Sequence, residues 1–375
     1  MSTSGKAFSL CHNGIFLPLL YNLPIICVLN MRLLLLLLLL LKSFPSFGQE
    51  SQAQRLQDEH IKILCIGNSF SMDATLCLPQ LIVDMGVPNS KQCVYCAMYA
   101  GASLDYWWEH CSRGDTIAYL YRMSGTKLED RPWTVAELLH LPWDVVILQQ
   151  ASVYSDQLET YRPYLKNMVE MVRRESANPD VIIAFQMTWS KHPTARTGPY
   201  GAEGWQRIAQ TVRQMCQEVG ITTIIPTGTV LQNLRCTELN TPLLITRDAF
   251  HLAYGIGQYA AALAFYESIC RPITGKSALG IPPSEAMKAI HAGEEGFLPI
   301  TDENFRLIHD CVKAAMTNPF ELTTDASAID LPLVSSPSNS FSPTAIYNLS
   351  GRQLLQPQPG VNIVGGKKVL VRPNR

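Results

Sequence analysis

The sequence predicts an α/β protein built on a parallel β-sheet that helices cover on both faces. Short, mainly apolar runs at 61–66, 144–148 and 181–185 have the composition of strands that are buried on both sides. Amphipathic segments separate these runs, and strands that alternate with helices form parallel βαβ units. A chain of 375 residues with 47% hydrophobic and 16% charged residues can bury a core of this kind.

The elements follow from periodicity and from turn residues. We expect strands at 61–67, 92–99, 144–148, 181–186 and 222–225, and a β excursion at 116–123. We expect helices at about 73–85, 133–139, 157–174, 204–218, 254–270, 283–293 and 302–316, with a further helix around 106–108. Ligands of parallel sheets bind beyond the carboxyl ends of the strands. The loops that meet there are 67–71, 100–104, 149–152 and 187–192.

The first 48 residues read as a leader. Met31 and Arg32 precede nine leucines, and small residues up to Gly48 complete the pattern of a secretory signal peptide at 31–48. Residues 1–30 then read as a doubtful extension upstream of the true start. A longer membrane anchor that also uses 15–29 is the alternative. We therefore expect an exported protein in the periplasm, on the cell surface or secreted, with membrane contact only through the leader.

The main domain is expected at 58–318, and the composition changes after it. Residues 319–342 have the Ser-, Thr- and Pro-rich character of a linker. Short alternating segments with glycine turns then predict a small β module at 343–375. This module either docks on the main domain or acts as a tag.

Charge and cysteine usage exclude several classes of function. The formal net charge of −1 gives no electrostatic footprint for nucleic acid. Cys93 and Cys96 form a CxxC, but they lie in a predicted strand, where residues three apart point to opposite faces. No second ligand pair accompanies them, so we expect neither a metal site nor a cofactor.

A serine, a histidine and an aspartate fall on loops of the predicted active edge. Ser69 follows the first strand, and Asp248 and His251 lie three residues apart late in the chain. A nucleophilic serine needs an imidazole to take its proton, and the imidazole needs a carboxylate to fix its tautomer. Ser69 could instead cap the following helix. The downstream pair favours Ser69 as nucleophile and leaves Ser71 as the expected cap.

An acyl-transfer site also needs donors for the developing oxyanion. The candidates are the backbone N–H groups of Ser69 and Gly101 and the side-chain amide of Gln150, and Gln149 is an open alternative to Gln150. Gly101 is placed where the backbone must approach closely.

These blocks resemble the SGNH (GDSL-like) hydrolases over about residues 60–270. Gly-Asn-Ser-Phe-Ser at 67–71 matches the serine block, Gly101 the glycine block and Asp-Ala-Phe-His at 248–251 the last block. The third block departs from the family, because Gln150 stands near the position of its asparagine. The opening is similar to that of a Bacteroidetes subgroup known as a domain of unknown function. The C-terminal segment resembles β modules of exported Bacteroidetes proteins, some of which are sorting signals read by secretion machinery.

The resemblance implies a three-layer α/β/α flavodoxin-like sheet, no metal, and ester hydrolysis through an acyl-serine. It predicts an exported serine esterase that removes O-acyl, often acetyl, groups from carbohydrate, with lipid esters or thioesters as alternatives. Asn68, Trp189 and His192 are candidate substrate-binding residues, and Asn68 is also expected to brace the turn of Ser69. A catalytically idle glycan-binding or surface protein that keeps the fold is the alternative from another class.

Overall fold

The computed structural model describes residues 61–125 and 127–323 and four short strands between 346 and 371. The predicted leader at 31–48 and the extension at 1–30 lie outside the described residues. Within the described part of the chain, no helix combines the length and apolarity needed to cross a membrane. The chain divides into two units after Glu321, and each is described separately.

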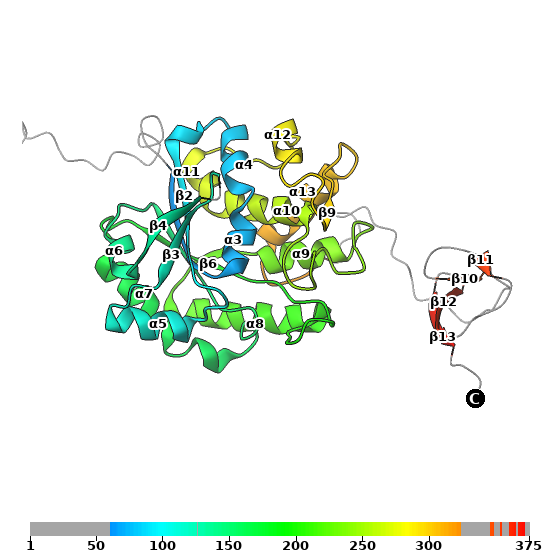
Figure 1. The fold of residues 1–375 in the computed structure, drawn as a ribbon, viewed down its shortest axis with the longest axis horizontal. Coiled ribbons are helices and arrows are strands. Elements are labelled where there is room, and N and C mark those ends of the chain that lie inside the picture. The colour runs from blue at the N-terminus through cyan, green and yellow to red at the C-terminus, as the bar shows by residue number, and fades with distance from the viewer. Residues whose placement is uncertain are drawn as a thin grey trace, which may run out of the picture. The chain divides into compact units, whose positions relative to one another are not determined.

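The first unit is built on a seven-stranded sheet in the order β4-β3-β2-β1-β5-β6-β7 (Figure 1). Its strands are β1 Ile61–Gly67, β2 Gln92–Met98, β3 Ala118–Arg122, β4 Lys127–Trp133, β5 Val145–Gln149, β6 Ile182–Gln186 and β7 Thr223–Ile225. The five strands from β2 to β7 in this order pair in parallel, which is the flavodoxin-like arrangement. All five residues of β5 are buried, as expected for a strand covered on both faces.

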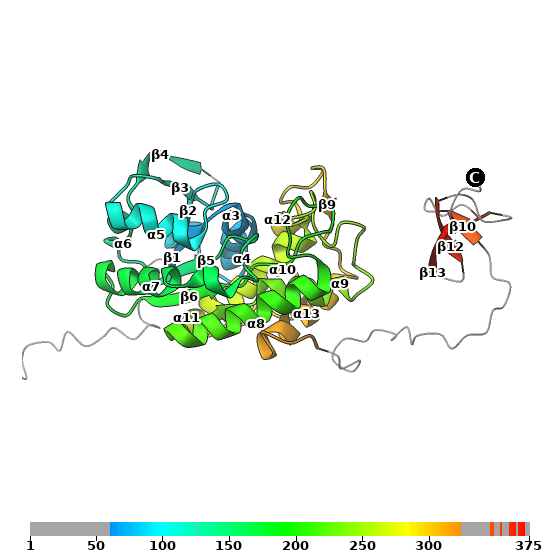
Figure 2. The ribbon, with the colours of Figure 1, turned by 90° about the horizontal axis from the view of Figure 1, so that it is seen from below.

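Helices form a layer on each side of this sheet, so the fold has three layers (Figure 2). One layer contains α3, α4 and α10, and the other contains α5, α7 and α8. The helices are α3 Ser69–Thr75, α4 Leu78–Asp84, η1 Asn89–Lys91, α5 Leu104–Arg113, α6 Val135–Leu139, η2 Leu158–Tyr161, α7 Tyr164–Glu175, α8 Gly201–Val219, α9 Thr227–Arg235, α10 Ile256–Phe265, the π-helix η3 Tyr266–Cys270, α11 Arg271–Thr274, α12 Glu285–Lys288 and α13 Phe305–Thr317. A short parallel pair joins β8 Tyr254–Gly255 to β9 Phe297–Leu298.

Several elements differ from the sequence expectation. The segment at 157–174 is divided into η2 and α7, and the helix expected at 283–293 is only the four-residue α12. The segment at 73–85 is two helices, because α3 ends at Thr75 and α4 starts with Pro79 near its first turn. Strand β4 was not expected, and it forms an antiparallel hairpin with β3 at one edge of the sheet. Its sequence, Lys-Leu-Glu-Asp-Arg-Pro-Trp, carries four charges and Pro132, a composition that occurs in edge strands.

The second unit contains a four-stranded antiparallel sheet in the order β11-β10-β12-β13. These strands are β10 Ile346–Asn348, β11 Gln353–Leu354, β12 Gly360–Val364 and β13 Lys367–Val371. They lie in the region where the small β module was expected.

Candidate active site

The turn between β1 and α3 carries the predicted nucleophile. Ser69 is the first residue of α3, and Asn68 is its N-cap, with its Oδ1 accepting the N–H of Phe70 at 2.9 Å. The expectation that Ser71 caps the helix is therefore wrong. The N–H of a first helical residue has no acceptor within its own helix, so the Ser69 N–H is available to a ligand.

Ser71 instead belongs to a buried polar group beneath α3. Its hydroxyl lies 2.6 Å from Gln149 Oε1 and 2.9 Å from Gln186 Oε1. A Cβ on Gly67 would approach the Ser71 Oγ to 2.4 Å and the Gln149 Cγ to 2.9 Å. Only glycine therefore lets the turn and this group pack so closely.

The three residues predicted for catalysis come together in the structure. The Ser69 Oγ lies 3.1 Å from Nε2 of His251, and Nδ1 of the same ring lies 2.6 Å from Oδ2 of Asp248. The serine comes from the start of α3, and its partners lie 182 and 179 positions later, on the loop before β8. The chain thus presents a nucleophile, a base and an orienting carboxylate in line.

The local backbone fixes the aspartate against the histidine. Asp248 Oδ1 accepts the backbone N–H of His251 at 2.7 Å, and Ala249 between them has a φ of 73°. Partial burial acts to raise the pKa of Asp248, but the hydrogen bonds and charge of His251 outweigh it and hold that pKa below its ordinary value. The carboxylate therefore remains ionised at neutral pH and can stabilise an imidazolium.

Asp73 connects the loop of His251 to the helix of Ser69. Its Oδ1 accepts from Nη1 of Arg247 at 2.8 Å and from the amide of Gln258 at 2.7 Å, and its Oδ2 accepts the N–H of Leu252 at 2.5 Å. Burial raises the pKa of Asp73, while the Arg247 charge acts to lower it. This group of hydrogen bonds holds the two halves of the candidate triad in register.

Neither Asp73 nor Arg247 was predicted as a site residue. Asp73 reads in the sequence as an ordinary acidic residue near a helix start, and Arg247 lies 174 positions away. Asp73 is only 4% exposed, and a charged side chain is rarely buried without a charged partner. A charged residue on the helix face that must be buried is therefore the signal that could have indicated this pair.

Gly101 lies in a turn beside the nucleophile. The turn runs from Tyr99 to Ala102, whose N–H donates to the Tyr99 carbonyl at 3.1 Å. Gly101 has a φ of 70°, and an added Cβ would meet nothing within 4 Å, so conformation rather than crowding requires glycine here. The Asn68 amide donates to the Ala102 carbonyl at 2.9 Å, which links this turn to the turn of Ser69.

Gln150 does not fit its predicted role as an oxyanion donor. Its Nε2 donates both of its hydrogens to Thr160, to the carbonyl at 3.0 Å and to Oγ1 at 3.1 Å. Its Oε1 accepts the N–H groups of Leu104 and Ala151. The Gln149 Nε2 is buried without a hydrogen-bond partner among the described residues, but its side chain lies beneath α3. The available donors of the predicted set are thus the N–H groups of Ser69 and Gly101.

The three candidate substrate-binding residues have different positions. Trp189 is fully buried, stacks on Phe70 with 4.4 Å between ring centroids and donates to the Phe250 carbonyl at 2.7 Å. Asn68 is 2% exposed, and its amide is used by the two turns. Both predictions are therefore wrong, because these side chains are core and cap. His192 is half-buried, and its N–H donates to the Ala249 carbonyl at 2.8 Å, beside the triad loop.

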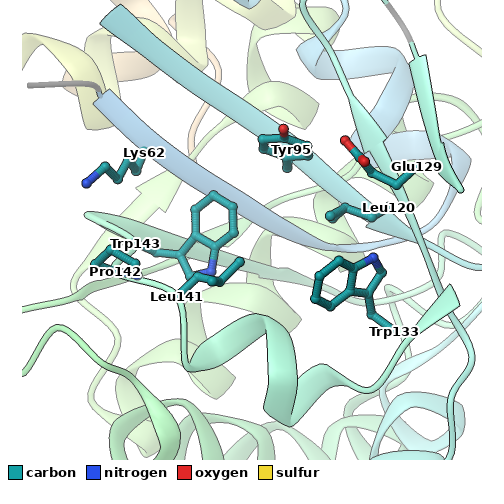
Figure 3. Close-up of a pocket in the computed structure, with 8 residues that line it drawn as sticks. All are labelled: Lys62, Tyr95, Leu120, Glu129, Trp133, Leu141, Pro142 and Trp143. Atoms are coloured by element: carbon teal, nitrogen blue, oxygen red, sulfur yellow. The ribbon is translucent and has the colours of Figure 1, made fainter. Parts of the chain in front are cut away.

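A separate pocket of about 330 Å³ lies at the other end of the sheet (Figure 3). Its lining is mainly apolar and consists of Lys62, Tyr95, Leu120, Glu129, Trp133, Leu141, Pro142 and Trp143. Lys62 is near the start of β1 and Ser69 follows its end, so seven residues at about 3.3 Å each separate the two sites by about 20 Å. In the part of the chain that the structure describes, no group of three His, Cys, Asp or Glu side chains could hold a metal.

Comparison with known proteins agrees with this architecture. A solved structure of a DUF4886 family protein from Bacteroides uniformis matches with a TM-score of 0.61 and 23% identity, covering 72% of this chain and 99% of that chain. A proposed SGNH hydrolase from Slackia heliotrinireducens matches with a TM-score of 0.38 and 17% identity over 56% of this chain and 99% of that one. An acetyl xylan esterase matches with a TM-score of 0.38 and 12% identity over 56% and 100%.

A search of curated proteins gives no match. The family model described as "Domain of unknown function (DUF4886)" matches residues 62–279, a span that contains β1 from its second residue, β2 to β7 and the whole candidate triad. This span is more than half of the chain. The chain therefore belongs to the DUF4886 family.

Proposed function

We propose that this protein is an exported serine esterase that removes O-acyl groups, chiefly acetyl, from carbohydrate. Two hydrogen-bond contacts support the esterase. Ser69 Oγ lies 3.1 Å from His251 Nε2, and His251 Nδ1 lies 2.6 Å from Asp248 Oδ2. A serine activated in this way attacks acyl carbonyls. The carbohydrate substrate and the export rest on the resemblance to SGNH hydrolases and on the leader pattern at 31–48.

The reaction proceeds in two halves. Ser69 Oγ adds to the ester carbonyl carbon while its proton passes to His251 Nε2, and the tetrahedral intermediate collapses as His251 returns that proton to the leaving alcohol. A water molecule then attacks the acyl-serine with His251 as base, which releases the acid and restores the serine. Asp248 stabilises the imidazolium in both halves. The backbone N–H groups of Ser69 and Gly101 stabilise the negative oxygen.

The test is hydrolysis of p-nitrophenyl acetate by the purified protein. We expect release of p-nitrophenol by the wild type, and Ser69→Ala should abolish it because, among the described residues, Ser69 is the hydroxyl that contacts Nε2 of His251. Ser71→Ala is the matched control, since Ser71 is a buried helix residue that does not contact His251. Turnover by Ser69→Ala equal to the wild type would exclude Ser69 as the nucleophile.

One observation favours the second candidate, an idle glycan-binding protein. The Gln150 amide, which stands nearest the family's third oxyanion donor, is occupied by Thr160. Removal of one oxyanion donor costs on the order of 10²–10³ in rate. A folded wild type that hydrolyses neither p-nitrophenyl acetate nor acetylated oligosaccharides would favour this candidate over the esterase.

A further inference from the structure

Three tyrosines from separate parts of the chain gather at one edge of the candidate site, where the ring of Tyr99 contacts the other two. Tyr99 follows β2, Tyr106 lies in α5 and Tyr119 lies in β3. Tyr99 stacks on Tyr106 with 4.8 Å between ring centroids and an interplanar angle of 28°, and its ring lies 6.5 Å from that of Tyr119. We refer to Tyr99, Tyr106 and Tyr119 as the tyrosine strip.

Two of the three rings in the tyrosine strip are exposed, where a structural cluster would be buried. Tyr99 is 36% exposed and Tyr119 is 43% exposed, while Tyr106 is half-buried. By contrast, the neighbouring Trp107 of α5 is 1% exposed and belongs to the core. A single exposed aromatic ring requires no explanation, but rings that gather on a surface mark an interaction site.

The strip adjoins the proposed oxyanion donors. Tyr99 begins the turn that contains Gly101, and its N–H donates to the Gly67 carbonyl, at the end of β1, at 3.3 Å. Two positions after Gly67 comes Ser69, the proposed nucleophile. Tyr119 stands opposite Met98 in the sheet, so the strip continues from this turn across the β2–β3 edge.

We propose that the tyrosine strip is a carbohydrate subsite, which holds the sugar rings next to the acylated position while Ser69 attacks the ester. This inference rests on the proposed esterase function and adds the part of the molecule that recognises the sugar. An aromatic ring offers an apolar face to the C–H face of a pyranose, and its phenol can hydrogen-bond the sugar hydroxyls.

The chemistry of the strip favours a sugar over an acyl chain. An acyl chain gains most from a cavity that excludes water on all sides, whereas the rings of Tyr99 and Tyr119 remain open to solvent. A sugar needs only one face covered, and its other hydroxyls stay hydrated.

The experiment compares two substrates with the same acetyl group. For each variant we take the ratio of kcat/KM for a partially acetylated cello-oligosaccharide to kcat/KM for p-nitrophenyl acetate. Tyr119→Ala and Tyr106→Ala should each lower this ratio by about 10-fold, the loss of one stacked ring. Tyr119→Phe should lower it less, because the ring is kept. Leu141→Ala is the control, since Leu141 is similarly exposed, at 39%, in the pocket at the other end of the sheet.

Three further outcomes separate this inference from its alternatives. Ratios equal to the wild type in Tyr119→Ala and Tyr106→Ala would overturn the subsite while leaving the esterase intact. If Tyr119→Ala and Tyr106→Ala lower kcat/KM for p-nitrophenyl octanoate as much as for the oligosaccharide, the strip binds an acyl chain, and the proposal of a sugar subsite is overturned. If the wild type is inactive, titration calorimetry of Ser69→Ala with the same oligosaccharide still tests the strip. Binding that Tyr119→Ala removes would support it, and absence of binding would overturn it.

Discussion

Asn68 shows how much one short side chain contributes to the candidate site. Its Oδ1 caps α3 at Phe70 N–H, and its Nδ2 donates to the carbonyl of Ala102. The turn that carries Ser69 and the turn that carries Gly101 are therefore connected through a single amide. The two proposed oxyanion donors are fixed relative to each other by this residue.

Gln150→Ala should affect stability more than catalysis. The substitution leaves the buried N–H groups of Leu104 and Ala151 without their acceptor, which costs about 1–3 kcal/mol for an unsatisfied group. We expect a lower thermal midpoint in a melting experiment and a kcat for p-nitrophenyl acetate within about 10-fold of the wild type. A loss of 10²-fold or more in kcat without loss of stability would restore Gln150 as an oxyanion donor.

The sequence predicts the residues of the triad, but it does not predict the direction in which the Gln150 and Trp189 side chains point. Asp248 and His251 are close in sequence, and Ser69 follows a strand whose apolar run is unmistakable, so the sequence alone places all three on one edge. The direction of Gln150 depends on Thr160, and the burial of Trp189 depends on Phe70, contacts that no local pattern contains.

At the scale of elements, the central strands were predictable because their composition is set by burial on both faces. Strand β4 was not, because an edge strand does not need the apolar alternation that identifies strands in a sequence. The amphipathic pattern over 73–85 predicts one helix because it continues across the break near Pro79.

Asp73→Asn should loosen the loop of His251 from α3. The change leaves the Arg247 guanidinium without a charged partner and replaces an acceptor of the Leu252 N–H. A displacement of about 1 Å in a catalytic group costs on the order of 10²-fold in rate, so we expect kcat to fall by roughly that factor with a small change in KM. Steady-state kinetics with p-nitrophenyl acetate measures both.

The control for this variant is Arg207→Gln. Arg207 forms an ion pair with Asp156 at 2.9 Å but is 51% exposed, and such surface pairs contribute little. It should therefore keep the wild-type kcat. An Asp73→Asn protein with wild-type kcat and KM would show that the loop is held by other contacts.

At the scale of the whole molecule, a buried histidine links stability to pH. His309 in α13 is 4% exposed, its Nδ1 accepts the Gly280 N–H at 2.8 Å and its Nε2 lies 2.8 Å from the Tyr259 hydroxyl. Protonation of His309 at Nδ1 would leave the Gly280 N–H without its acceptor. Burial lowers the pKa of His309 to about 4 from its ordinary 6.5.

This pKa predicts acid destabilisation. Because the unfolded chain binds the proton more tightly than the folded one, stability is full above pH 6.5 and is lost as the pH falls towards 4. Between pH 8 and pH 5 the free energy of unfolding should decrease by about 2 kcal/mol from this group. Urea denaturation at the two pH values measures it. His309→Gln should reduce the difference, and an equal pH dependence in both proteins would contradict the assignment.

The two borders of the large sheet also affect how the molecule behaves among copies of itself. One border is β4, with its four charges and Pro132, and the other is β7, which has only three residues. Unpaired strand edges invite other chains to add to a sheet, and charge, proline and short length each oppose this. Neither border offers a long apolar template for intermolecular β-pairing, since β4 is charged and β7 is short. The sheet is therefore protected against edge-to-edge aggregation even when the protein is concentrated.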